Sequence, residues 1–176
     1  MLKQIALAGS AWMAFKLILL AYVDFPSVIK FGVMANLLIL IILASIAGLK
    51  APAELGFVTR VKSVLQPVML YAVVAAGLSG LFYYQIAAEH TNLQRLEAEQ
   101  AISEKLGTDE AFALWQAEDP RVREYLKREE TQERALEQVS TMFSPFTQMS
   151  LHLTGLLFAG LLTALFTTIL TGWLRS

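Results

Sequence analysis

Four long apolar segments constrain what this chain can fold into more than any other feature of its sequence. They cover about residues 5–23, 31–49, 64–88 and 147–174. Each is close to the roughly 20 residues that a helix, rising about 1.5 Å per residue, needs to cross about 30 Å of hydrocarbon. The segments are continuously apolar rather than alternating, which favours helices over the strands of a barrel. We therefore predict an all-α fold, a four-helix transmembrane bundle, within a single integral membrane domain over residues 1–176.

The composition agrees with a membrane protein and excludes several classes of activity. Hydrophobic residues make up 56% and charged residues 16% of the chain, against about 45–50% and about 25% in soluble domains. The absence of cysteine excludes disulfides, thiolate catalysis and iron–sulfur clusters. The net charge of −1 argues against a nucleic-acid partner. Phosphate-binding loops and hydrolase motifs are missing from the sequence, so we expect no enzyme, no catalytic residues and no cofactor.

Charge is distributed unevenly, and this predicts the orientation. Residues 89–146 hold seven basic and thirteen acidic side chains, a net charge of −6. The N-terminus, the connection between the second and third segments, and the C-terminus carry an excess of Lys and Arg; with four spans these three regions share one side. By the positive-inside rule that side is cytoplasmic. Both termini are then cytoplasmic, and the acidic stretch lies on the outer side.

The acidic stretch is rich in helix formers from about residue 89 to 143. We predict that the third span continues outward as one helix to about Leu106, and that a turn at Gly107 precedes a short helix over residues 110–117. Asp119, as N-cap, and Pro120, at the first helical position, would start a returning helix.

The returning helix is expected to carry an interrupted apolar stripe. Ser144 and Pro145 close it and lead into the fourth span. A charged run from 127 to 134 breaks the stripe, so we expect a loose extracytoplasmic helical hairpin rather than a regular coiled coil. The apolar residues of the stripe are Val122, Tyr125, Leu126, Leu136, Val139 and Phe143.

Two further patterns bear on packing. Residues 51–63 alternate apolar with polar side chains, which suits a short interfacial helix or, alternatively, the first turns of the next span. Small residues recur every four positions and predict close helix packing within one bundle, with a homodimer seam as the alternative. These small residues are Ala6, Ser10 and Ala14; Ala72, Ala76 and Gly80; and Gly155, Ala159, Thr163 and Thr167.

Lys16 is the one charge deep within a span, and an ionisable group there is a functional candidate. We expect its ammonium to reach the outer interface near Asp24 or an acceptor such as Asn36 on the second helix. Gln66 and His152 complete a candidate intramembrane polar site with these two. Lys16 also falls where the apolar core of a cleaved signal peptide would continue, so we expect the first segment to remain as a span.

Two histidines and a carboxylate could hold a zinc ion. Glu89 and His90 lie at the outer end of the third span and His152 near the start of the fourth. They show no helical ligand spacing, and the histidines are far apart in sequence. We therefore predict no metal site.

The order of these features resembles a known family. The segment 57–62 (FVTRVK) precedes a span ending in 81–86 (LFYYQI), and after the charged insert 143–148 (FSPFTQ) leads into a glycine-containing last span. This pattern resembles the small four-span bacterial membrane proteins of domain of unknown function 4199. The resemblance implies a multi-pass protein of a bacterial inner membrane and brings no activity with it.

Two functional hypotheses follow. The favoured one is a non-enzymatic membrane protein whose acidic hairpin engages a periplasmic partner, with Trp115, Tyr125, Glu129 and Glu130 as the candidate partner surface. The alternative is an oligomeric permease for an ion or small solute that uses Lys16 and the other intramembrane polar residues. The expected partners are the lipid bilayer and either a periplasmic protein or further copies of the chain.

Overall fold

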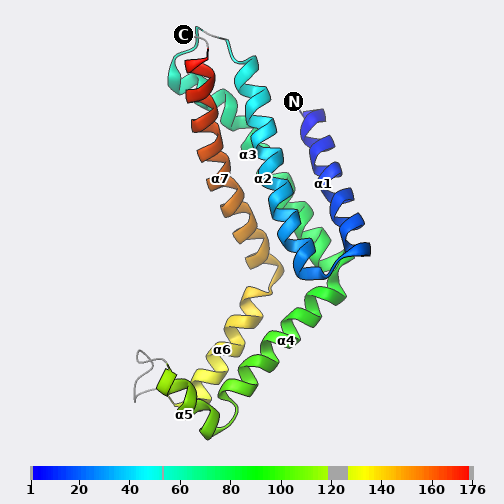
Figure 1. Cartoon of the computed structure of the whole chain (residues 1–176), viewed down its shortest axis with the longest axis vertical. Coiled ribbons are helices and arrows are strands. Elements are labelled where there is room, and N and C mark those ends of the chain that lie inside the picture. Colours follow the sequence, from blue (N-terminus) through cyan, green and yellow to red (C-terminus); the bar gives the residue numbers. More distant parts are fainter. Residues whose placement is uncertain (1, 53, 119–126, 175–176) are drawn as a thin grey trace. The chain divides into compact units, whose positions relative to one another are not determined.

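A computed structural model of the chain describes residues 2–52, 54–118 and 127–174 (Figure 1). Within these ranges the chain is helical and forms no strand, as the apolar periodicity predicts. The helices are α1 (Leu2–Tyr22), α2 (Phe25–Lys50), α3 (Phe57–Leu81), the π-helix η1 (Phe82–Ile86), α4 (Ala88–Leu106), α5 (Asp109–Glu118), α6 (Arg128–Met142) and α7 (Pro145–Trp173).

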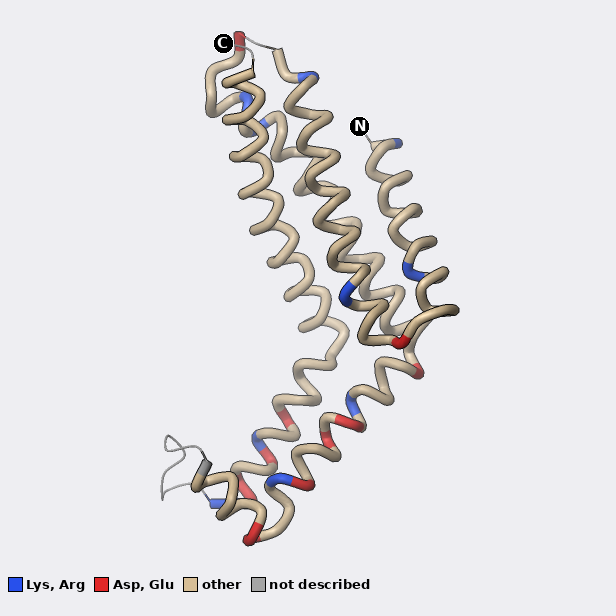
Figure 2. The backbone as a smooth tube through the Cα atoms, viewed as in Figure 1, with Lys and Arg blue, Asp and Glu red and all other residues tan. Residues whose placement is uncertain are grey.

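Internal contacts divide the chain into two compact units. Unit 1 comprises Met1–Phe82 and Met149–Ser176, and unit 2 comprises Tyr83–Gln148. The acidic insert recognised in the sequence therefore coincides with a separate packing unit. Figure 2 shows charged residues concentrated along α4, α5 and α6 and sparse along α1, α2, α3 and α7.

Among the described residues four helices are long and apolar enough to cross a membrane, so the four spans expected from sequence are confirmed at the level of length and composition. They cover Leu2–Tyr22, Phe25–Lys50, Phe57–Ile86 and Pro145–Trp173. Even the shortest has 21 residues, which corresponds to about 30 Å of helix.

Local capping explains where two of these helices begin. The Asp24 carboxylate accepts hydrogen bonds from the backbone N–H of Ser27 at 3.1 Å and from its hydroxyl at 2.8 Å, so α2 starts well before the predicted residue 31. Ser144 accepts a hydrogen bond from the N–H of Thr147, and Pro145 is the first residue of α7, so this helix starts two residues before the predicted residue 147. These caps satisfy N–H groups that the first helical turn leaves unpaired.

The two ends of the third helix bear differently on the sequence expectation. It begins at Phe57, so residues 57–63 are its first turns, which is the second of the two alternatives for this segment, and not a separate interfacial helix. The prediction of one continuous helix to Leu106 is wrong, because the chain passes through η1 and a non-helical Ala87 before α4 begins. The Thr91 hydroxyl donates to the Tyr83 carbonyl at 2.9 Å and to the Ala87 carbonyl at 3.0 Å. The hydroxyl thus provides a donor for two carbonyls where the helix is interrupted at η1 and Ala87. No glycine or proline occurs in residues 82–91 to mark this interruption in the sequence.

In unit 2, α4 packs along α6, and α5 packs against α4. The short helix expected over 110–117 is confirmed as α5, and Thr108 caps it by accepting from the N–H of Ala111 at 3.2 Å. The predicted helix start at Asp119 and Pro120 lies outside the described residues, as do Val122, Tyr125 and Leu126 of the predicted stripe. The rest of that stripe is half-buried on α6 and just after it: Leu136, Val139 and Phe143.

The core of unit 1 lies among α1, α2, α3 and α7. Small residues let α7 approach, since Gly160 faces Val68 and Leu40, and Gly48 on α2 faces Thr167. The buried apolar cluster consists of Ile5, Leu40, Leu43, Ala44, Val64, Val68, Tyr71, Ala72, Ala75, Leu156 and Ala164.

The predicted small-residue faces are only partly correct. Ala72 and Ala76 are buried as expected, and Gly80 is half-buried against Met149. On α7 the predicted row starts at Gly155, which is exposed, and reaches the buried face only at Thr167. A strict four-residue spacing drifts around a helix of 3.6 residues per turn, so such a row lies on the contact face over only part of its length. The row on α1 is exposed throughout: Ala6, Ser10 and Ala14.

Candidate functional site

The most distinctive polar arrangement in unit 1 begins on α1. The buried face of this helix consists of Ile5, Gly9, Trp12 and Lys16, at the three- and four-residue spacing of a single helical face. Lys16 therefore points into the bundle and is fully buried, with a relative exposure of 0%. Of the two positions expected for its ammonium, the outer interface near Asp24 is therefore wrong, and an acceptor such as Asn36 stays a prediction.

Two aromatic rings receive the Lys16 ammonium. Its Nζ lies 5.0 Å from the centroid of the Trp12 ring and 3.9 Å from that of Phe82. A desolvated cation over an aromatic face gains roughly 2 kcal/mol, and inserting a lysine at a membrane helix centre costs roughly 2.5–3.5 kcal/mol. The two rings therefore offset much of that cost.

Gly32 makes room for this arrangement on α2. A Cβ added there would lie 3.1 Å from Cε of Lys16, so a larger residue would displace the lysine stem. The Gly32 carbonyl also accepts a buried hydrogen bond from Nε1 of Trp12 at 2.8 Å. Gly32 thus fixes the Trp12 ring through its carbonyl and, because it has no side chain, leaves space for the Lys16 side chain.

A second polar group joins α2, α3 and α7. The Tyr71 hydroxyl donates to Oδ1 of Asn36 at 2.5 Å, and Nδ2 of Asn36 lies 3.0 Å from Nε2 of His152. An amide nitrogen donates only, so in this arrangement Nε2 accepts and the imidazole carries its proton on Nδ1. The His152 ring lies 6.2 Å from the Trp12 ring, which connects the two polar groups.

We call Trp12, Lys16, Asn36, Tyr71, Phe82 and His152 the inner polar cluster. It includes three of the four residues predicted for an intramembrane site. Gln66 is absent from it, because this side chain is exposed on α3 beside Lys62 and Met69.

Sequence reasoning missed three aromatic members of the cluster. Trp12 lies one helical turn from Lys16, and this spacing is the signal from which the pair could have been expected. Tyr71 and Phe82 are separated from Lys16 by more than 50 positions, and only the packing of α1 on α3 brings these segments together.

Unit 2 holds the predicted partner surface. Trp115 is half-buried, and its ring lies 5.7 Å from that of buried Phe112, so part of the indole already packs within the unit. Glu129 and Glu130 are exposed at the start of α6, and Glu130 lies 3.8 Å from Nζ of Lys127. Tyr125 lies outside the described residues.

Arg128 links the three helical segments of unit 2 and was not singled out from sequence. Its Nε lies 2.8 Å from Oδ1 of Asp109, and its Nη1 donates to the Gly107 carbonyl at 2.7 Å. The Tyr84 hydroxyl donates to the Phe143 carbonyl at 2.7 Å, farther along the unit. A planar guanidinium can serve a carboxylate and a carbonyl together, which fixes the turn between α4 and α5 against α6.

No group of three histidine or carboxylate side chains that could hold a metal ion occurs in the described part of the chain.

Comparison with protein-family models, with curated proteins and with solved structures finds no match to this chain.

Proposed function

We propose that this chain is a non-enzymatic, multi-pass protein of a bacterial inner membrane that engages a protein partner in the periplasm through unit 2. In this proposal both termini are cytoplasmic, and α4, α5 and α6 form a helical hairpin outside the membrane. Domain of unknown function 4199 is the family proposed for it, on the aromatic, basic and small residues that carry the resemblance.

The charge distribution supports this orientation. The four apolar helices carry few charges. Those of the region from the last residue of α2 to the first turns of α3 are Lys50, Arg60 and Lys62 against Glu54 alone. Basic residues near span ends are retained on the cytoplasmic side. Unit 2 begins after the third span and is then on the opposite side.

Exposed leucines on the polar helices of unit 2 carry the proposal of a partner. Leu93 and Leu96 on α4 are 51% and 52% exposed, and Leu114 on α5 is 69% exposed. Leu93 and Leu96 are three residues apart and therefore share one side of α4. Apolar side chains surrounded by charged ones are typical of the centre of a protein interface. A partner with an apolar groove and a basic rim would complement this acidic unit.

The permease alternative has weaker support. Its proposed path needs Gln66, which is exposed on a different face of α3 from the inner polar cluster. Asn36 is engaged by Tyr71 and His152, and the Lys16 ammonium lies over two rings. These contacts join helices together and thereby support a structural role for the cluster.

Single-cysteine labelling tests the orientation, because the chain has no native cysteine. A membrane-impermeant maleimide should label Ala101→Cys on the exposed side of α4 in spheroplasts. The matched variant Gly56→Cys, between α2 and α3, should be labelled only after permeabilisation. The reverse pattern would refute the orientation.

Site-specific photo-crosslinking tests the partner. A photoreactive residue at Leu96 should capture a periplasmic protein, whereas one at exposed Gln100 should capture much less of it. The double variant Leu93→Ser/Leu96→Ser, with the crosslinker at Leu114, should lose this product while membrane insertion stays unchanged.

If deletion of residues 92–138 leaves the function intact and Lys16→Leu abolishes it, the permease hypothesis replaces this one.

A further inference from the structure

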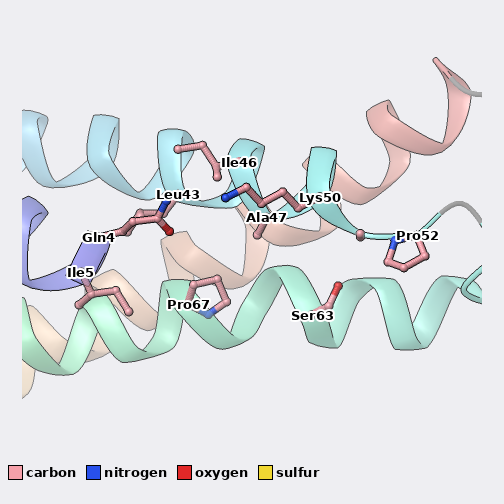
Figure 3. A pocket seen from close by; sticks show the side chains of 10 residues that line it. Gln4, Ile5, Leu43, Ile46, Ala47, Lys50, Pro52, Ser63 and Pro67 are labelled. Carbon is pink, nitrogen blue, oxygen red and sulfur yellow. The ribbon is translucent and has the colours of Figure 1, made fainter. Parts of the chain in front are cut away.

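A cavity of about 320 Å³ lies between α1, α2 and α3, close to the end of α2 (Figure 3). Its floor is apolar and buried, with Ile5, Leu43 and Pro67 contributed by three different helices. Its rim is polar, and Gln4 and Lys50 are exposed there. The cavity is therefore amphipathic, with an apolar base and a charged mouth.

The rim side chains are directed at this space. Figure 3 shows the Lys50 side chain running back along α2, with its ammonium near Ile46, and the Ser63 hydroxyl directed from α3 toward α2. Gln4 approaches from α1, beside Leu43. One cation and two uncharged polar groups thus border the same opening.

Pro67 removes one backbone donor from the wall. Proline has no backbone N–H, so Pro67 cannot donate to the carbonyl of Ser63, four residues earlier in α3. The Ser63 hydroxyl donates to the Arg60 carbonyl at 2.8 Å, which leaves the hydroxyl oxygen able to accept. Ser63 therefore offers a hydroxyl oxygen, on the α3 side of the cavity, that can accept from a hydroxyl group of a bound molecule.

We propose that this cavity binds the hydroxyl-bearing headgroup of an anionic phospholipid of the phosphatidylglycerol class. Lys50 would pair with the phosphate, Ser63 would accept from the headgroup hydroxyls, and Ile5 and Leu43 would contact the glycerol ester region. The inference rests on the membrane placement proposed above and not on the periplasmic partner.

Charge and surroundings favour a lipid over a free anion. Basic residues outnumber acidic ones at this end of unit 1, and the cytoplasmic leaflet is where anionic lipid meets such residues. A soluble phosphate would gain nothing from the apolar floor, whereas a lipid extends onto it. A cavity near the lower limit of about 300 Å³ for ligand pockets suits a headgroup whose acyl chains remain in the bilayer.

The test uses the full chain in phosphatidylcholine nanodiscs that contain a small fraction of phosphatidylglycerol. Lipid retained on the protein is counted by native mass spectrometry. Lys50→Gln should weaken phosphatidylglycerol retention about five-fold, because one basic residue near a membrane contributes about 1 kcal/mol toward anionic lipid. Ala47→Leu, which fills the cavity without changing charge, should weaken it as well.

The matched control is Lys62→Gln, which removes an exposed lysine from a different face of α3. It should leave retention nearly unchanged, and an equal loss in this variant would overturn the proposal in favour of diffuse surface attraction. Displacement by soluble glycerol phosphate would assign the cavity to a free anion and also overturn it, as would equal retention of phosphatidylethanolamine.

The outcome separates this inference from the proposed function. A chain that inserts with the expected labelling pattern but shows no preference for phosphatidylglycerol contradicts the lipid site alone. A chain that does not enter the nanodisc bilayer contradicts both. Thermal unfolding of each variant in detergent must match the parent chain, and any variant that unfolds early is replaced by Lys50→Met or Ala47→Val.

Discussion

Lys16 in unit 1 and Arg128 in unit 2 both join helices, but they do so in opposite surroundings. Lys16 is fully buried, with its ammonium over the rings of Trp12 and Phe82. Arg128 retains 27% of its side-chain exposure and binds the carboxylate of Asp109 and the carbonyl of Gly107. The first contact depends on excluding water, and the second depends on hydrogen-bond geometry that water can replace.

The same contrast extends to the rest of the two units. In unit 1, small residues bring helices together around a buried core, and the inner polar cluster connects all four helices. In unit 2, α6 has no buried residue, and defined hydrogen bonds from Tyr84, Thr91 and Arg128 hold the segments. Unit 1 should therefore be sensitive to side-chain volume and buried charge, and unit 2 to the loss of individual polar contacts.

The largest effect is expected from reversing the charge at Lys16. Lys16→Glu would place an anion against the negative faces of two rings and should destabilise the protein by about 3–5 kcal/mol, as an uncompensated buried charge does. Lys16→Leu should leave insertion and expression intact or improve them. Membrane expression and thermal unfolding in detergent are measured for both Lys16 variants. Lys30→Glu, the same charge reversal at an exposed position, is the control. Equal damage from Leu and Glu would show that the amine itself is needed.

Overpacking at Gly160 should have the next largest effect. A side chain there meets Val68 and Leu40 at once, so Gly160→Val should cost about 1–3 kcal/mol. Gly155→Val is the matched control on the same helix, because nothing lies within 4 Å of a Cβ at that position. The measurement is the difference in thermal unfolding between the two variants. Similar losses would mean that helix propensity, and not packing of α7 on α3, limits stability.

Removal of Arg128 should affect unit 2 alone. Arg128→Ala loses a charge-assisted contact and a carbonyl hydrogen bond, and we expect local destabilisation of about 1–2 kcal/mol. Hydrogen exchange should accelerate in α5 and α6 while amides of α2 and α3 remain protected. Arg134→Ala, at an exposed position of α6, provides the comparison. Faster exchange throughout unit 1 would contradict the independence of the two units.

The smallest effect concerns the cap of α2. The hydroxyl and backbone N–H of Ser27 lower the pKa of the Asp24 carboxyl below its ordinary value. A folded-state pKa below the unfolded one stabilises the fold above the unfolded value, and this contribution is lost as pH falls through the folded value. Asp24→Asn keeps an acceptor but does not titrate, so the difference in unfolding temperature between it and the parent should shrink in acid. A pH-independent difference would contradict the charged cap.

Much of the fold follows from local sequence. Continuous apolarity determined the four long helices, and Ser144 with Pro145 determined where α7 begins, because length and capping depend on residues close together in the chain. The same local information located the acidic insert that forms unit 2. It could not reveal η1, since a π-helical turn closed by the Thr91 hydroxyl has no compositional mark.

The candidate site required tertiary structure. Lys16, Asn36 and His152 are conspicuous in sequence as polar residues in apolar segments, but which of them meet depends on the direction each helix turns toward its neighbours. Gln66 is also a polar residue in an apolar segment, but it lies on a face of α3 that is turned away from the inner polar cluster. Phe82 and Tyr71 are not conspicuous in the sequence. Packing of α3 against α1 and α2 nevertheless brings Phe82 to Lys16 and Tyr71 to Asn36. Apolar length is a property of one segment, whereas a contact depends on the rotation and registry of two, and only the folded bundle fixes these.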